Sequence, residues 1–402
     1  MRKYLSNEVF KPGAFPKHTY ISRVSSEFAY TYEFRLKQAL NTSGFLTSII
    51  GPSKTGKTVL CEKVIGLENL VSLTGNDFKG ALPFWTTIAN RVGLAIEGEQ
   101  LHTNMVAGER IEGITESNSS SFREKYLTGK DQVIDYFNKN KLVLVLDDFH
   151  YAPEETQLDM SYQLKDAIRK EFKAIVISLP HRADDAIRKN ADLSGRLSLI
   201  NIEPWQIDSL KEIAITGFNT LDININDELA TFLAAESLTS PQLMQSICLS
   251  LSLLLDLDTN IEIQEITNRN DLINAFKATT INLPYKDIVK RLKSGPPTRG
   301  QQRKTYSIGS GEEVDIYDLL IKALALDPPS TYITLDDVKV RIDRILRDIP
   351  GKPDRNKIKS AIEQVQSIIN NSEAIYQVFE WKDDVIYILD PLFLFYLRWG
   401  SY

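Results

Sequence analysis

The stretch SIIGPSKTGKTVL, Ser48–Leu60, decides the fold class of this chain. It starts at the end of the apolar run FLTSII, passes through a glycine-containing turn, and ends in the helical pattern KTVLCEKVIG. Its centre, GPSKTGKT (Gly51–Thr58), matches G-x-x-x-x-G-K-S/T at every position. A strand, a glycine-rich loop and a helix in this order are typical of a phosphate-binding loop. The stretch therefore predicts an α/β domain that binds a nucleotide.

The residue types of this loop match the chemistry of a nucleotide site. Glycines let backbone N–H groups surround a phosphate, and the helix that follows presents its positive end. We expect Lys57 to reach the β- and γ-phosphates and the Thr58 hydroxyl to bind Mg²⁺. The expected nucleotide contacts are Gly51, Pro52, Ser53, Lys54, Thr55, Gly56, Lys57, Thr58 and Val59.

Four further apolar runs follow the loop: NLVSLTG, LVLVLDD, AIVISLP and LSLINIEP. Helical patterns such as PFWTTIANRVGLAI and ETQLDMSYQLKDAIRKEF lie between them. Continuous apolar strands separated by helices indicate a parallel sheet that is covered on both faces. Residues 97–128, which contain ESNSSS, are an expected surface excursion. The prediction is an α/β core with a P-loop and a parallel sheet over 45–205, after a lead-in over 1–44.

The run KLVLVLDDFHYAP places five apolar residues before Asp147 and Asp148. A strand that ends in a carboxylate beside the P-loop would hold Mg²⁺ through its water shell at Asp147. Asp148 would orient or deprotonate the attacking water. The alternative is a buried strand with an aspartate-rich turn, but the complete P-loop favours the catalytic interpretation. Because aspartate reaches less far than glutamate, we expect slow turnover.

Two other strand boundaries carry polar residues that could act in catalysis. Ser178 ends the run AIVISLP, and Ser178 or Arg182 could sense the γ-phosphate at the sheet edge. Arg182 could equally be an exposed loop residue paired with a nearby aspartate. Arg196 directly precedes the last core strand, where it could act in trans on the nucleotide of a neighbouring subunit. The alternative for Arg196 is a surface residue at a helix C-terminus.

From Gln206 onward the strand signals give way to helical patterns. We expect a helical lid over 206–283, with Asn226 and Ser240 as helix caps. Residues 284–310 are rich in Gly, Pro and basic residues, which predicts a linker or extended arm. Residues 311–402 show three helical patterns and a hairpin that turns at Lys382–Asp384. This is the order of elements in a winged helix.

Together these motifs resemble the AAA+ ATPases and the related STAND ATPases, of the origin-recognition and transposition-regulator types, over about residues 20–402. The resemblance implies an ATP- and Mg²⁺-dependent ATPase that forms a nucleotide-dependent homo-oligomer. TYISR, with Tyr20 and Arg23, is similar to the motif that packs on the adenine in these families. SPQLMQ, with Pro241, is similar to the start of their sensor-2 helix, but Gln242 stands where an arginine is common. The start TYISR and the tail DPLFLFYLRW also resemble a group of bacterial ATPases with a TYV-x-R start.

Charge limits the classes of partner. With a net charge of −6 the whole chain is not a general nucleic-acid binder, so DNA binding requires a local patch. Residues 286–304 hold seven basic residues and one acid, which suits phosphate-backbone contacts or merely keeps a linker extended. The predicted wing carries Glu380, Asp383 and Asp384, which favours a protein-docking or intramolecular role.

Two cysteines and the lack of a long apolar run predict a cytoplasmic protein without a membrane segment. Three functions stay open. The chain could be a nucleotide-driven assembly switch in signalling or phage defence, with a protein client. It could be a DNA-binding factor that loads or positions a partner on DNA, or a nucleotide-stabilised scaffold without meaningful hydrolysis.

Overall fold

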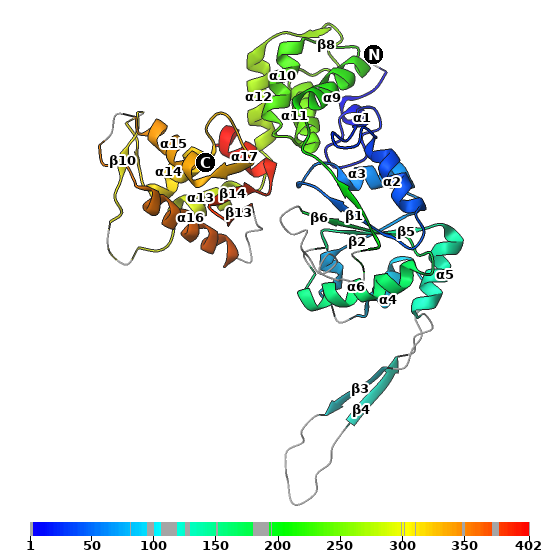
Figure 1. Ribbon diagram of the computed structural model, residues 1–402. Helices are drawn as coiled ribbons and strands as arrows, with labels where there is room; N and C mark the ends of the chain where they lie inside the picture. The colour runs from blue at the N-terminus through cyan, green and yellow to red at the C-terminus, as the bar shows by residue number, and fades with distance from the viewer. Residues whose placement is uncertain are drawn as a thin grey trace, which may run out of the picture. The chain divides into compact units, whose positions relative to one another are not determined.

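The computed structural model describes residues 3–80, 82–94, 100–105, 119–124, 129–149, 152–179, 193, 195–298, 300, 302–309, 311–347, 350–371 and 378–401 (Figure 1). The chain forms two compact units. Unit 1 comprises Met1–Arg23, Pro52–Gly56 and Glu203–Tyr402, and unit 2 comprises Val24–Gly51 and Lys57–Ile202. The middle of the P-loop, Pro52–Gly56, therefore belongs to unit 1, and we call it the P-loop crest. The strand and helix that flank it belong to unit 2.

Unit 2 is built on a five-stranded parallel sheet with the strand order β2-β5-β6-β1-β7. Each of the five predicted apolar runs forms one strand, which confirms the α/β class. All residues of β1 and β6 are buried, which explains why β6 (AIVIS) is apolar almost throughout and why neither strand alternates between apolar and charged residues. The strands are β1 (Leu46–Ile50), β2 (Leu70–Thr74), β5 (Val143–Asp147), β6 (Ala174–Ser178) and β7 (Leu197–Asn201).

Helices cover both faces of this sheet. On one face, α2 (Tyr32–Asn41) and α3 (Lys57–Ile65) pack against Val143 and Val145 of β5. On the other face, Leu144 and Leu146 pack in a cluster with side chains of α4 (Phe84–Arg91), α5 (Lys130–Asn140) and α6 (Glu154–Ile168). Alternate residues of one strand thus point to opposite faces, as the strand period requires. The result is a three-layer αβα domain.

The predicted surface excursion at 97–128 contains regular structure that the sequence did not indicate. Strands β3 (Gln100–Met105) and β4 (Ser119–Glu124) pair in antiparallel fashion as a separate two-stranded sheet. Gln100 lies opposite Glu124 and Met105 lies opposite Ser119. The polar composition of β4, SSSFRE, hides its strand character from a hydrophobic pattern.

The first part of unit 1 contains the predicted helical segment. Its helices are α1 (Ser6–Val9), α9 (Ile207–Thr220), α10 (Asp227–Glu236), α11 (Pro241–Leu254) and α12 (Arg269–Thr280). Strands β8 (Asn224–Ile225) and β9 (Glu265–Ile266) form a short parallel pair. Both predicted caps are present, because Asn226 accepts from the Leu229 amide at 2.8 Å and Ser240 accepts from the Leu243 amide at 3.2 Å.

Part of the predicted linker or extended arm over 284–310 is a packed helix instead. Residues Lys286–Ser294 form helix α13, whose residues Ile288, Val289 and Leu292 are buried. Helical spacing of these three apolar residues gives the segment a face that the core covers. A short antiparallel pair, β10 (Tyr306–Ser307) and β11 (Glu313–Val314), follows. The basic residues misled the interpretation, because four of the seven, Lys286, Lys290, Arg291 and Lys293, belong to a packed helix.

The C-terminal segment contains the three predicted helices and the predicted hairpin. They are α14 (Ile316–Leu324), α15 (Leu335–Ile345), α16 (Arg355–Asn370), β13 (Phe379–Lys382) and β14 (Val385–Ile388). The hairpin turns at Asp383 and Asp384, which both have positive φ, as a two-residue turn requires. A strand that we did not predict, β12 (Tyr332–Thr334), pairs with β14 and gives a three-stranded sheet of order β12-β14-β13.

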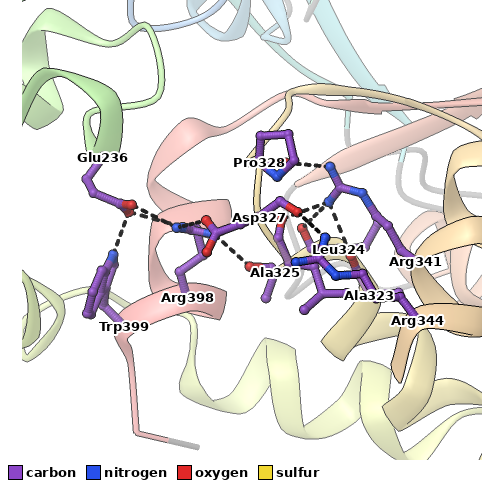
Figure 2. Close-up of polar contacts among 11 residues, drawn as sticks. Glu236, Ala323, Leu324, Ala325, Asp327, Pro328, Arg341, Arg344, Arg398 and Trp399 are labelled. Carbon is purple, nitrogen blue, oxygen red and sulfur yellow. Dashed lines mark hydrogen bonds and ion pairs between the residues drawn. The ribbon is translucent and has the colours of Figure 1, made fainter. Parts of the chain in front are cut away.

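The apolar tail forms helix α17 (Pro391–Trp399), which packs inside unit 1. Phe393, Leu394 and Phe395 are buried, and the Trp399 ring lies 4.8 Å from that of Phe276 in α12. Figure 2 shows how Arg398 and Trp399 meet the carboxylate of Glu236, the last residue of α10. The tail is therefore part of a core. Within the described ranges, no helix combines the length and apolarity needed to span a membrane.

Candidate functional site

The predicted site residues of unit 2 gather where the parallel strands end. Gly51 follows β1, Ser178 ends β6 and Asp147 ends β5. Because the strands are parallel, all three positions lie at the carboxyl edge of the sheet. Ser178 is paired with Ile50, and its carbonyl oxygen accepts a hydrogen bond from the Gly51 amide at 3.4 Å. The start of the P-loop and the candidate phosphate sensor are thus direct neighbours.

Strand β6 lies between β1 and β5, so the aspartate strand is not next to the P-loop strand. Side chains span the gap, because the Thr58 hydroxyl donates to Asp147 Oδ2 at 2.6 Å. The two residues predicted to bind Mg²⁺ therefore meet, although 89 positions separate them.

The donor set of this pair suits Mg²⁺. Mg²⁺ prefers oxygen ligands, takes one or two from the protein, and completes its octahedron with waters and phosphate oxygens. The Thr58 hydroxyl would bind the ion, and the Asp147 carboxylate, 2.6 Å from that hydroxyl, would hold the ion through its water shell. The described residues contain no group of three or more His, Cys, Asp or Glu side chains that would form an all-protein metal site.

Lys57 is the first residue of α3 and is 9% exposed. Its ammonium group donates to the Gly51 carbonyl oxygen at 2.9 Å. The charge therefore lies against the start of the loop instead of extending into solvent.

The two aspartates have different environments. Asp147 is half-buried and turned toward Thr58, whereas Asp148 is exposed. Asp148 has a φ of 47°, in the left-handed region that costs a non-glycine residue free energy, and its amide donates to Asp147 Oδ1 at 2.9 Å. Such backbone strain is often found at functional sites. One carboxylate contacts Thr58 and the other is exposed; Mg²⁺ binding by Asp147 and water activation by Asp148 stay predictions.

Cys61 lies one turn after Lys57 in α3 and is fully buried. Burial raises the pKa of its thiol far above the usual range, and the charge of Asp147 raises it further. The thiol therefore stays protonated and has no catalytic nucleophile character.

In unit 1, two carbonyl oxygens of the P-loop crest accept hydrogen bonds from residues outside the loop. Lys54 has a φ of 62° and Gly56 a φ of 88°, so the backbone turns sharply on both sides of Thr55. The Thr55 carbonyl oxygen accepts from the Trp205 indole N–H at 2.9 Å. The Lys54 carbonyl oxygen accepts from the Ser240 hydroxyl at 3.5 Å. No pattern in the sequence indicates either contact, since both donors lie more than 145 positions away.

The residues expected to contact adenine also belong to unit 1. The Tyr20 ring stacks on Phe15, with centroids 5.7 Å apart. The Arg23 guanidinium lies 4.4 Å from the centroid of the Trp205 ring and donates to the Glu203 carbonyl oxygen at 3.0 Å. Pro241 is the first residue of α11. Arg23 thus contacts Trp205, whose indole in turn contacts the P-loop crest.

Arg196 lies at the opposite edge of the sheet from the P-loop. Its carbonyl oxygen accepts from the Leu46 amide at 2.9 Å, at the amino end of β1. The five residues of β1 span about 16 Å at the usual rise of a strand. Arg196 therefore cannot serve the nucleotide loop of its own chain. Arg182 lies outside the described residues.

Comparison with known proteins gives no family model and no curated protein that matches this chain. In structure the chain is similar to Cdc6p from Pyrobaculum aerophilum, at 14% identity and a TM-score of 0.44, covering 97% of this chain and 96% of that one. It is also similar to a Walker-type ATPase of Pyrococcus abyssi, at 12% identity and a TM-score of 0.47, covering 91% of this chain and 94% of that one. A third structure is the RuvB Holliday junction branch migration motor of Thermotoga maritima, at 11% identity and a TM-score of 0.41, with 91% and 92% covered. At these values the likeness carries no argument, and the function must be argued from the residues of this chain.

Proposed function

We propose that this chain is an ATP-binding and slowly hydrolysing ATPase of the AAA+/STAND-like kind, which acts as a nucleotide-dependent assembly switch. One observation carries the proposal. A P-loop motif that is complete in sequence ends in Thr58, and the hydroxyl of Thr58 contacts the carboxylate that ends β5. A chance match to the motif would not be accompanied by an acidic side chain placed 2.6 Å from its last residue.

Each group of the site has a defined task in this proposal. The loop amides and Lys57 bind the β- and γ-phosphates, while Thr58 and Asp147 hold Mg²⁺, which supplies charge neutralisation of the phosphates when bound. Asp148, exposed beside the pair, orients the attacking water and accepts its proton. Ser178, at the neighbouring strand end, donates to the γ-phosphate. We expect slow turnover because the side chain of Asp148 is shorter than that of a glutamate and reaches less far toward the attacking water.

The position of Arg196 supports assembly. An arginine at the far edge of the sheet is of no use to its own site, but its side chain is partly exposed and another subunit could bind there. We propose that it completes the nucleotide site of a neighbouring copy in a homo-oligomer, so that assembly and hydrolysis depend on each other. The helices and hairpin of 311–402 support a winged-helix domain for a protein client. In signalling or phage defence, such a switch would assemble with ATP and dissociate after hydrolysis.

The alternative, a DNA-binding factor that positions a partner on DNA, is supported by three exposed basic residues on the outer face of α13. We call them the α13 basic face: Lys286, Lys290 and Arg291. The rest of the predicted arm is less suited, because Arg303 pairs with Asp315 at 2.7 Å and Lys293 pairs with Asp318 at 3.1 Å.

The helix that would face DNA in a winged helix is also occupied by contacts within the protein. In α16, Lys359 and Arg355 contact Asp384 of the hairpin turn at 2.8 and 3.2 Å. The Lys359 ammonium group holds the pKa of Asp384 below its usual range, and Arg355 lowers it further. The carboxylate therefore stays charged at neutral pH and offsets the positive helix. These contacts favour the switch over the DNA factor.

The test is ATP binding and turnover by the full chain. Calorimetry with Mg²⁺-ATP should detect binding by wild type and none by Lys57→Ala, because the substitution removes the charge that bridges the phosphates. Asp148→Asn should bind ATP as wild type does and hydrolyse none. Equal ATP affinity of wild type and Lys57→Ala would refute the site. Wild-type binding without turnover would leave the nucleotide-stabilised scaffold as the function.

A further inference from the structure

We infer that Trp205 and Ser240 are positioning residues that orient the phosphate-binding amides of the P-loop, and that Arg23 braces Trp205 for this task. The inference rests on the proposed nucleotide site and assigns to these three residues a role beyond it. Trp205 and Arg23 do not need to touch the nucleotide. They act through the carbonyl oxygens on the outer side of the loop.

The argument starts from the geometry of a peptide bond. In a trans peptide the C=O of one residue and the N–H of the next point in opposite directions. Fixing the Thr55 carbonyl outward therefore fixes the Gly56 N–H inward, and fixing the Lys54 carbonyl outward does the same for the Thr55 N–H. The indole of Trp205 holds the first carbonyl at 2.9 Å, and the Ser240 hydroxyl makes a longer and weaker contact with the second at 3.5 Å. Two consecutive amides are thereby aimed at the place where a phosphate would lie.

The loop needs such external support because its own backbone is easily reoriented. Lys54 and Gly56 both have positive φ, and glycine in particular moves between conformations at little cost. Thr55 is 3% exposed, and its hydroxyl donates back to the Pro52 carbonyl oxygen at 2.8 Å. The amides become a preformed anion site only when the peptide planes around Thr55 are held. Preformed donors require no reorganisation free energy when the ligand binds.

Arg23 fixes the orientation of the indole. Its guanidinium stacks over the Trp205 ring at 4.4 Å and donates to the Glu203 carbonyl oxygen at 3.0 Å, so it contacts both the ring and the segment that precedes it. Trp205 itself is 9% exposed. A planar guanidinium suits this stack, whereas a lysine ammonium group does not. Arg23 of the TYISR motif therefore affects phosphate binding indirectly, through Trp205.

The experiment compares ADP with AMP, because loop amides that bind the β-phosphate distinguish the two ligands. Trp205→Phe removes the indole donor and keeps an aromatic ring for Arg23 to stack on. We expect ADP affinity to fall about 5- to 10-fold, the usual effect of one hydrogen bond, and AMP affinity to stay within about 2-fold. Trp85→Phe is the matched control, because the Trp85 indole donates to Gln163 Oε1 at 3.0 Å in unit 2. It should leave both affinities unchanged.

Arg23→Gln gives a second test, which can also be used if Trp205→Phe does not fold. It should lower ADP affinity in the same selective manner, and the double variant should bind ADP no more weakly than Trp205→Phe does, since both act through one contact. Arg23→Lys should not restore ADP affinity.

Three outcomes are distinguishable. A selective loss of ADP affinity in Trp205→Phe supports the inference. Unchanged ADP affinity in a folded Trp205→Phe protein, or equal losses for ADP and AMP, would overturn it while leaving the nucleotide site intact. Absence of ADP binding in wild type itself would overturn the proposed function, and the inference with it.

Discussion

Removing Arg398 should destabilise unit 1 by about 3–5 kcal/mol, the usual cost of breaking a buried ion pair. Arg398 and Glu236 side chains are 7% and 8% exposed, and the guanidinium binds the carboxylate through two hydrogen bonds of 2.7 and 3.1 Å (Figure 2). Arg398→Met would leave the buried Glu236 carboxylate with the Trp399 indole, at 2.7 Å, as its remaining contact in this network. An uncompensated buried charge of this kind accounts for most of the expected cost.

The matched control is the exposed side of the same network. Asp327 also accepts from Arg398 at 2.7 Å, but its side chain is 73% exposed. Solvent screening reduces such a pair to about 1 kcal/mol or less, so Asp327→Asn should change stability little. Arg398→Lys keeps the charge but loses the bidentate contact. Its loss of stability should lie between those of Arg398→Met and Asp327→Asn.

Because the chain has two units, the assay must follow unit 1 alone. Three of the four tryptophans lie in unit 1 and Trp85 lies in unit 2, so a Trp85→Phe background makes tryptophan emission a reporter of unit 1. Urea titrations should show a midpoint about 1 M or more lower for Arg398→Met, at a slope of about 3 kcal/mol/M. A second test combines it with Glu236→Gln, for which the loss should be at least about 2 kcal/mol smaller than the sum of the single losses. A free-energy loss below about 1 kcal/mol, or one no larger than that of Asp327→Asn, would refute the reasoning.

The remaining predictions concern the nucleotide site, assembly and DNA. Asp147→Asn should weaken Mg²⁺-dependent ATP binding while Asp148→Asn should not, because only Asp147 contacts Thr58; calorimetry that shows equal loss in both would mean that the two roles are misassigned. Arg196→Ala should bind ATP normally but hydrolyse it on the order of 10³-fold more slowly, and mixing it with Lys57→Ala should restore part of the activity; turnover that is independent of protein concentration and shows no rescue would contradict assembly. Neutralising the α13 basic face should reduce DNA affinity for all sequences alike and lower the salt dependence by about one unit for each phosphate that is no longer bound. If wild type binds no DNA even at low salt, the DNA-factor hypothesis loses its support.

The sequence alone predicted those features that depend on residues close together in the chain. The P-loop motif, the five apolar strands and the caps Asn226 and Ser240 are local patterns, which can be recognised from residues that are adjacent in the sequence. The chemistry of the motifs likewise predicts that Thr58 and Asp147 act as a pair on Mg²⁺. Local pattern failed at α13, where the number of basic residues concealed three apolar positions that only a neighbouring core could bury.

Tertiary structure decided what depends on contacts between distant segments. A list of strands does not give their order, so the position of β6 between β1 and β5 was not predictable from one sequence. The contacts of Trp205 with Thr55 and of Arg398 with Glu236 join residues 150 and 162 positions apart. Each contact exists because hydrophobic burial brought two remote segments together and left polar groups that had to find partners. A sequence shows which side chains can form hydrogen bonds, but only packing determines which of them meet.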